Sequence, residues 1–228
     1  MSERLTRAPF FPPVETALSE PNGLLAMGGD LSVARLLEAY RHGIFPWFNP
    51  GEPILWWSPD PRMVLVPGEV RVARSLAKRI RNGGFEVRVD SAFAEVMRGC
   101  AAPREGESGT WISPAMVAAY SRLFEAGYAH SVETWHDRQL VGGLYGVAIG
   151  RMFYGESMFS REPDASKVAL VRLAQQLQQW QFGLIDCQME TPHLASLGAR
   201  TMPRAAFTAR LAQLVKWPHR PGPWTFDL

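Results

Sequence analysis

One stretch constrains the fold of this chain more than any other, and it reads Gly150-Arg151-Met152-Phe153-Tyr154-Gly155-Glu156-Ser157-Met158-Phe159-Ser160. Residues 151–154 favour a strand, and Gly155 is expected to end that run at a bulge or a close backbone approach. The next residue, Glu156, is a carboxylate among apolar neighbours. Burying an unpaired charge is costly or shifts its pKa. The sequence therefore predicts a cation or hydrogen-bond donors beside Glu156.

A second strand carries two more polar residues. It reads Gly183-Leu184-Ile185-Asp186-Cys187-Gln188-Met189 and is otherwise mostly apolar. Successive strand side chains point to opposite faces, so strict alternation puts Asp186 and Gln188 on the same face. Polar groups on an apolar face need partners there. We therefore expect Glu156, Asp186 and Gln188 to line one cleft.

The remaining periodicity predicts an α+β fold with a change of character at residue 62. Residues 1–61 form a small N-terminal lobe rich in aromatic residues and proline, and residues 62–228 form the main domain. In the main domain, helical and strand patterns alternate around an antiparallel meander. We expect strands at 63–66, 85–89, 129–135, 139–145, 146–154 and 183–189, and helices at 71–82, 92–99, 114–126, 166–180 and 193–199.

The N-terminal lobe contains a stiff aromatic segment. Trp47, Trp56 and Trp57 are interspersed with prolines, which restrict the backbone. Such indoles either stack on a nucleobase or pack the lobe against the rest of the chain. Before this segment, Asp30 or Ser32 is suited to cap a helix with Leu36, Leu37, Tyr40 and Ile44 on its apolar face.

A cluster of positive charge follows residue 62. It consists of Arg71, Arg74, Lys78, Arg79 and Arg81, with no acidic residue among them. On a helix, positions 71, 74, 78 and 81 share one face. This face is either simply solvated or a binding surface for nucleic-acid phosphates.

Composition excludes several classes of protein. Cys100 and Cys187 give no disulfide framework and no spacing for a metal site, which fits a reducing compartment. No apolar run approaches the ~18 residues of a membrane span, and the N-terminus has no apolar signal core. Ser157 and Ser160 lie outside any Gly-x-Ser-x-Gly motif, which disfavours a serine hydrolase. We expect a cytoplasmic enzyme or binding protein with no metal and no membrane contact.

These motifs together resemble the bacterial leucyl/phenylalanyl-tRNA–protein transferases. The resemblance runs from about residue 9 to residue 210, with the blocks in the same order. The matching blocks are Glu20-Pro21-Asn22-Gly23-Leu24-Leu25-Ala26-Met27-Gly28-Gly29-Asp30-Leu31, Gly43-Ile44-Phe45-Pro46-Trp47-Phe48, Trp56-Trp57-Ser58-Pro59-Asp60-Pro61-Arg62, Gly109-Thr110-Trp111-Ile112, Val141-Gly142-Gly143-Leu144-Tyr145-Gly146, Gly155-Glu156-Ser157-Met158-Phe159-Ser160, Leu184-Ile185-Asp186-Cys187-Gln188 and Ala195-Ser196-Leu197-Gly198-Ala199.

The resemblance implies an aminoacyltransferase. Leucine, also phenylalanine and less readily methionine, would move from aminoacyl-tRNA to proteins that begin with Arg or Lys, which marks them for degradation. The implied fold is a small N-terminal lobe followed by a domain like the GNAT acyltransferases, with a mixed, largely antiparallel sheet. The chain lacks the pyrophosphate loop of the CoA-using relatives before the helix at 166, which argues against acetyl-CoA. The tRNA ester already supplies the driving force, so no cofactor is required.

The resemblance also implies roles for individual residues. Glu156 would pair with the cationic N-terminal residue of the acceptor, and Asp186 would orient and polarise the amide of Gln188. Either Gln188 or the tRNA ribose hydroxyl would receive the proton from the attacking amine. The remaining assignments are an aminoacyl pocket of Leu144, Met158, Leu170, Leu173 and Ile185, adenosine binding by Trp47 and Trp111, and phosphate binding by Arg71, Arg74, Lys78, Arg79 and Arg81.

Two functions from other classes compete with this interpretation. A GNAT-like acyltransferase would use another activated acyl donor, such as a CoA ester. A non-catalytic RNA-binding module would use only the basic helix and the tryptophans.

Overall fold

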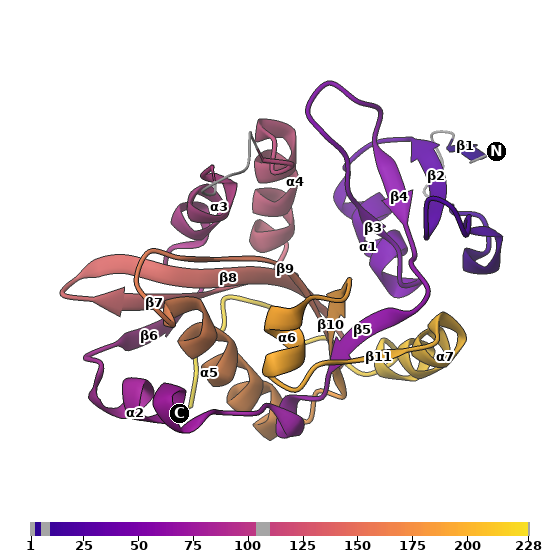
Figure 1. The fold of residues 1–228 in the computed structure, drawn as a ribbon. Helices are drawn as coiled ribbons and strands as arrows, with labels where there is room; N and C mark the ends of the chain where they lie inside the picture. The colour runs from indigo at the N-terminus through magenta and orange to yellow at the C-terminus, as the bar shows by residue number, and fades with distance from the viewer. Residues whose placement is uncertain (1–2, 6–9, 104–109, 228) are drawn as a thin grey trace.

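Two sheets organise the chain. The computed structural model describes residues 3–5, 10–103 and 110–227, so Gly109 of the motif at 109–112 lies outside the described residues. Figure 1 shows a small sheet beside a larger one. In the small sheet, whose order is β1-β2-β4-β3, the strands are β1 (Glu3–Leu5), β2 (Leu24–Gly28), β3 (Phe45–Pro46) and β4 (Leu55–Trp57).

Helix α1 (Val33–Arg41) packs beside the small sheet. The Ser32 hydroxyl accepts a hydrogen bond from the backbone N–H of Arg35 at 3.3 Å, so Ser32 is the cap. Leu36, Leu37 and Tyr40 are buried, which confirms this part of the predicted apolar face, whereas Ile44 is buried but lies beyond the end of the helix.

The larger sheet has seven strands in the order β11-β5-β10-β9-β8-β7-β6. All neighbours are antiparallel except β9 and β10, and that parallel pair is connected through helix α5 (Ala165–Gln179). The predicted α+β class with a mixed, largely antiparallel sheet is therefore confirmed. The strands are β5 (Arg62–Leu65), β6 (Glu86–Val89), β7 (Ala129–His136), β8 (Gln139–Ile149), β9 (Met152–Ser160), β10 (Leu184–Gln188) and β11 (Arg200–Met202).

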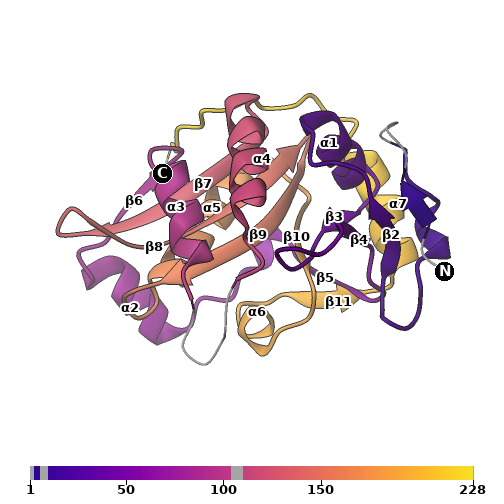
Figure 2. The ribbon, with the colours of Figure 1, turned by 90° about the horizontal axis from the view of Figure 1, so that it is seen from above.

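Helices cover both faces of the larger sheet. Figures 1 and 2 show α3 (Phe93–Ala101) and α4 (Pro114–Glu125) on one face and α5 on the other. Side chains alternate between the two sides, so Val64 and Tyr154 join the core toward α3, α4 and the lobe, whereas Met63 and Phe153 pack toward α5. The other helices are α2 (Arg74–Asn82), α6 (Pro192–Ser196) and α7 (Arg204–Leu214), with short 3₁₀ turns at Val14–Thr16 and Pro67–Glu69.

Two expectations about these elements are wrong. A bulge does lie beside Gly155, as expected, but strand β9 does not end there and continues to Ser160, because the register absorbs one extra residue. The basic helix begins at Arg74, so Arg71 lies before it, where its backbone N–H donates to the carbonyl of Leu197 at 2.9 Å. The division of the chain into residues 1–61 and 62–228 stays a proposal.

A buried ion pair connects the two parts of the chain. Arg62 and Asp186 have side chains only 1% and 0% exposed, and Nε and Nη2 of the arginine donate to the two carboxylate oxygens at 2.8 and 2.6 Å. The remaining Nη1 donates to the carbonyl of Gly43 in the lobe at 3.0 Å. The rings of Phe45 and Phe207 lie 4.7 and 4.8 Å from the guanidinium. Arg62 therefore binds β10, the lobe and α7 at one point.

This ion pair gives a prediction about stability. Asp186→Ala should lower the free energy of unfolding by ~3–5 kcal/mol, because it leaves the Arg62 guanidinium buried without a counter-charge. The double variant Arg62→Met/Asp186→Leu should recover most of that loss. Denaturant unfolding monitored by circular dichroism measures both effects.

The control is an exposed ion pair. Glu95 and Arg98 are 52% and 68% exposed, so Glu95→Ala should change stability much less. Equal losses for Asp186→Ala and Glu95→Ala would contradict the role of the buried pair.

Candidate active site

A cavity of about 540 Å³ lies beside the ends of β9 and β10. Pairing between these parallel strands runs from Met152–Leu184 to Tyr154–Asp186, and the cavity residues Glu156 and Gln188 follow. Its wall is largely apolar and comes mainly from β8, β9, α5 and β10, with further residues from α6 and from the segments after β3 and before α4. Of the predicted site residues, the structure brings together in this wall Leu144, Met158, Leu170, Leu173, Ile185, Trp47, Trp111, Glu156 and Gln188.

Two β-bulges aim the polar side chains into this cavity. In β9, Gly155 pairs with Gly146 and Ser157 with Tyr145, which leaves Glu156 as the extra residue. In β10, Asp186 pairs with Val64 and Gln188 with Met63, so Cys187 is extra. Bulges of this kind redirect side chains next to functional sites.

The second bulge corrects the prediction for Asp186. Strict alternation placed Asp186 on the same face as Gln188, but the extra residue Cys187 reverses the alternation between them. Asp186 therefore lies behind the cavity wall, paired with Arg62, and is not among the lining residues. It still contacts Gln188, because its Oδ1 accepts the backbone N–H of Gln188 at 2.9 Å. The predicted contact with the side-chain amide of Gln188 is absent, and that amide bonds to Glu156 instead.

This backbone bond holds an unusual conformation. Gln188 has a φ of +63°, in the left-handed region that few L-residues occupy. Asp186 stabilises that conformation from behind, and the conformation in turn points the Gln188 side chain at Glu156. Asp186 thus contacts Gln188 through the backbone and not through the side-chain amide.

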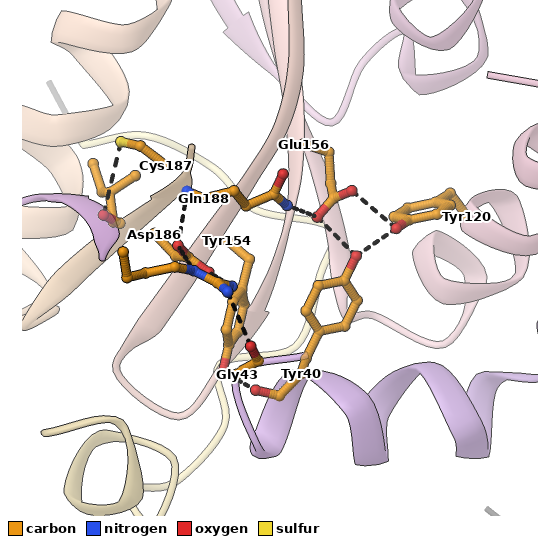
Figure 3. Close-up of polar contacts among 10 residues, drawn as sticks. Tyr40, Gly43, Tyr120, Tyr154, Glu156, Asp186, Cys187 and Gln188 are labelled. Carbon is orange, nitrogen blue, oxygen red and sulfur yellow. Dashed lines mark hydrogen bonds and ion pairs between the residues drawn. The ribbon is translucent and has the colours of Figure 1, made fainter. Parts of the chain in front are cut away.

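Glu156 accepts three hydrogen bonds (Figure 3). Tyr40 of α1 donates to Oε1 at 2.7 Å, Tyr120 of α4 donates to Oε2 at 2.9 Å, and Nε2 of Gln188 donates to Oε1 at 3.0 Å. The prediction that this carboxylate needs donors is confirmed. Burial raises the pKa of Glu156 to about 7, although the two phenol donors act in the opposite direction.

The same contacts fix the orientation of the Gln188 amide. Its nitrogen donates to Glu156, so its oxygen Oε1 is the end left to accept a hydrogen bond from a ligand. The cavity therefore combines an apolar wall with a carboxylate and an oriented amide oxygen. That combination suits an apolar acyl group next to a cationic amine.

Sequence reasoning missed Tyr40, Tyr120 and Arg62 as site residues. Tyr40 lies on the predicted apolar face of its helix, Tyr120 lies within the helix predicted at 114–126, and both are buried. A buried phenol hydroxyl usually has a hydrogen-bond partner. Two tyrosines on buried helix faces and one lone carboxylate could therefore have predicted hydrogen bonds from the tyrosines to Glu156. Arg62 lies at the start of a buried strand, and a buried cation likewise predicts a buried acidic partner.

The tryptophans separate into two groups. Trp47 is 41% exposed at the cavity, and its ring lies edge to face with Trp57 at 5.6 Å. Trp111 is half-buried and also lines the cavity. Trp56 is fully buried, and its Nε1 donates to the carbonyl of Gly28 at 2.9 Å, so it packs the lobe.

The five predicted basic residues also separate. Arg71, Arg74, Lys78 and Arg81 are exposed, and none of them forms an ion pair within the described part of the chain. Arg79 is different, since it pairs with Glu162 at 3.1 Å and lies 4.4 Å from the ring of Phe85.

Other reactive groups do not add to the site. Burial raises the pKa of the Cys187 thiol well above its usual range, which disfavours a thiolate nucleophile. Burial lowers the pKa of His193 at the cavity wall. Over residues 3–5, 10–103 and 110–227, no group of three or more His, Cys, Asp and Glu side chains could hold a metal ion. Within those ranges, no helix is long and apolar enough to cross a membrane.

Two solved structures show weak similarity to the chain. One is a GCN5-related N-acetyltransferase from Kribbella flavida, with a TM-score of 0.36 and 13% identity, covering 74% of this chain and 59% of that chain. The other is L-PGS from Bacillus licheniformis, with a TM-score of 0.42 and 13% identity, covering 73% and 54%. The fold is α+β, with a small N-terminal sheet and a larger mixed, largely antiparallel sheet, as the resemblance implied.

Sequence similarity is far stronger. The family model for leucyl/phenylalanyl-tRNA protein transferase matches residues 64–212, and the model for its N-terminal domain matches residues 29–60. A leucyl/phenylalanyl-tRNA–protein transferase of Thiobacillus denitrificans is 79% identical over 100% of both chains. One of Nitrosomonas europaea is 64% identical over 95% of this chain and 92% of its own length. This chain therefore belongs to the leucyl/phenylalanyl-tRNA–protein transferase family.

Proposed function

We propose that this protein moves leucine, also phenylalanine and less readily methionine, from aminoacyl-tRNA to the α-amino group of proteins that begin with Arg or Lys. The products are marked for degradation, and the reaction takes place in the cytoplasm. Family membership supports the reaction class. The observation that supports the acceptor choice is a single cavity in which the Glu156–Gln188 pair adjoins an apolar wall.

The apolar wall is suited to the aminoacyl side chain. Leu144, Leu170, Leu173 and Ile185 are buried, and Met158 adds a flexible fifth side chain. Such a pocket discriminates by only ~1–3 kcal/mol per methylene, so leucine, phenylalanine and methionine are all accepted to some degree.

The reaction is aminolysis of an ester. The acceptor amine attacks the ester carbonyl, a C–N bond forms, and the C–O bond to the tRNA ribose breaks. The α-ammonium loses two protons in total, of which one reaches the leaving ribose oxygen and one reaches solvent. Holding amine and carbonyl together supplies most of the acceleration. In this scheme, Oε1 of Gln188 receives the ammonium, and either that amide or the ribose hydroxyl takes the first proton.

The remaining parts of the tRNA have candidate partners. Trp47 and Trp111, on the cavity wall, are suited to hold the terminal adenosine by stacking. Exposed Arg71, Arg74, Lys78 and Arg81 are suited to the phosphates of the acceptor stem. Arg79 contributes less, because Glu162 already neutralises it.

The direct test is a transfer assay. Purified protein is incubated with radiolabelled leucyl-tRNA and peptides that begin with Arg, Lys or Ala, and label is followed into peptide. Label in the Arg and Lys peptides supports the proposal. Binding of tRNA without transfer would indicate an RNA-binding module, and activity with CoA esters in place of tRNA would indicate another acyltransferase.

Acceptor choice gives a prediction for Glu156. Glu156→Gln keeps the shape but removes the charge, so transfer to an Arg-started peptide should become slower by ~2–4 kcal/mol in effective barrier. Transfer to an Ala-started peptide should change much less. The measurement is kcat/KM for both peptides, and Glu190→Gln, at an exposed carboxylate near the site, is the matched control. Equal slowing of both peptides would contradict the assignment of Glu156 to acceptor choice.

The basic surface gives a prediction about salt. Arg74→Ala/Lys78→Ala should weaken aminoacyl-tRNA binding and reduce the slope of log affinity against log salt by about two, one for each lost phosphate contact. The control variant Arg210→Ala/Lys216→Ala removes the same charge from two exposed positions, in α7 and just after it. The same slope in the Arg74/Lys78 variant and the wild type would show that this helix face is only solvated.

A further inference from the structure

Three side chains form a closed ring of oxygen contacts at the base of the cavity. Tyr40 Oη lies 2.7 Å from Oε1 of Glu156, and Tyr120 Oη lies 2.9 Å from Oε2. The two hydroxyls also contact each other directly. The three residues come from α1, α4 and β9, and Figure 3 shows both phenols pointing at the carboxylate.

Counting protons distinguishes the two charge states of this ring. Each phenol carries one proton, and an ionised carboxylate carries none. With Glu156 ionised, two protons serve three oxygen–oxygen contacts, so one contact has no hydrogen. With Glu156 neutral, three protons serve three contacts. The bond from Gln188 Nε2 to Oε1 is available in both states.

The surroundings favour the neutral state when the cavity is empty. The neighbouring cation, Arg62, is already paired with Asp186. Tyr145 of β8 packs against Tyr120, and its buried hydroxyl has no hydrogen-bond partner among the described residues. The neighbouring thiols, Cys100 of α3 near Tyr145 and Cys187 of β10, offer no positive charge. Burial also raises the pKa of Glu156 to about 7.

We propose that Glu156, Tyr40 and Tyr120 share one extra proton in the free protein, and that a cationic acceptor side chain expels it on binding. This inference rests on the proposed function, because it takes the N-terminal Arg or Lys side chain as the ligand of Glu156. The proton leaves to solvent, Glu156 becomes negative, and the new charge pairs with the cation. A neutral acceptor leaves the proton in place. The empty site thereby avoids an uncompensated buried charge.

This exchange makes acceptor choice depend on pH. Binding that releases a proton weakens as pH falls, so kcat/KM for the Arg peptide should fall by about tenfold per pH unit below the midpoint of the cluster. The Ala peptide has the same α-amino titration but no side-chain cation. The ratio of the two values therefore isolates the cluster, and it should be level above the midpoint.

Tyr40 and Tyr120 act as positioning residues, and replacing either one should shift the pH at which the kcat/KM ratio changes. Tyr120→Phe removes a donor to the ionised carboxylate, so the inflection of the ratio should move to higher pH. Tyr40→Phe should do the same, which keeps the test open if one variant fails to fold. Tyr154→Phe is the matched control, because its buried hydroxyl donates to the carbonyl of Tyr40 and not to Glu156. The inflection of the control should stay where it is in the wild type.

The experiment combines two readouts. The first follows the ¹³Cδ signal of Glu156 in ¹³C-glutamate-labelled protein against pH, assigned by its loss in Glu156→Gln. The second is the Arg/Ala ratio of kcat/KM between about pH 5.5 and pH 8.5. We expect a signal midpoint near 7 in the free protein, lowered by saturating Arg peptide, and a ratio that rises with pH to a plateau.

Contrary outcomes separate the two proposals. A midpoint below about 5.5 in the free protein would overturn the shared proton. A large Arg/Ala ratio of kcat/KM that does not change with pH would also overturn the shared proton. It would still support the role of Glu156 in acceptor choice. A ratio near one at every pH would overturn the acceptor assignment and the expulsion step that depends on it.

Discussion

The buried pair of Arg62 and Asp186 is the interaction on which the rest of the structure depends. It joins β5 to β10, reaches the lobe through the carbonyl of Gly43, and holds the backbone N–H of Gln188. Each partner satisfies the other, so neither charge is left unpaired. One consequence concerns Glu156, because a cation already bound to Asp186 cannot serve a second carboxylate equally well. Glu156 instead accepts hydrogen bonds from three neutral donors, the hydroxyls of Tyr40 and Tyr120 and the amide of Gln188.

The geometry of this site depends on two irregularities in adjacent strands. A regular pair of strands would have kept Asp186 and Gln188 on one face, and no extra residue would have turned Glu156. The bulges bring together Glu156 and Gln188, which lie 32 positions apart in sequence. They follow the last paired residues of the parallel strands, where the sheet leaves room for a ligand. The rigid sheet then fixes the geometry, and the tyrosines of α1 and α4 hold the Glu156 carboxylate by hydrogen bonds.

Much of this arrangement could be predicted from the sequence, and the exceptions have physical reasons. Long periodic segments such as α4 and α5 and the apolar pocket followed from pattern and resemblance. The bulge at Cys187 could not be predicted, because one extra residue does not visibly change an alternating sequence pattern. In the structure, however, it moves every later side chain of the strand to the opposite face. The strands of the lobe are only two to five residues long, too short to show a period. The ion pair of Arg79 with Glu162 could not be predicted either, because the two residues lie 83 positions apart in the sequence.

We propose that Asp186 serves the reaction by positioning Gln188, and a double-mutant cycle can separate this role from a direct one. Single-turnover transfer from leucyl-tRNA to an Arg-started peptide is measured in Asp186→Asn, Gln188→Ala and the double variant, at a temperature where all are folded. If Asp186 acts only through Gln188, the double variant should be no slower than Gln188→Ala alone, since the two effects share one path. If instead the losses of the single variants add in the double variant, Asp186 has a role of its own in the reaction, and the claim is wrong.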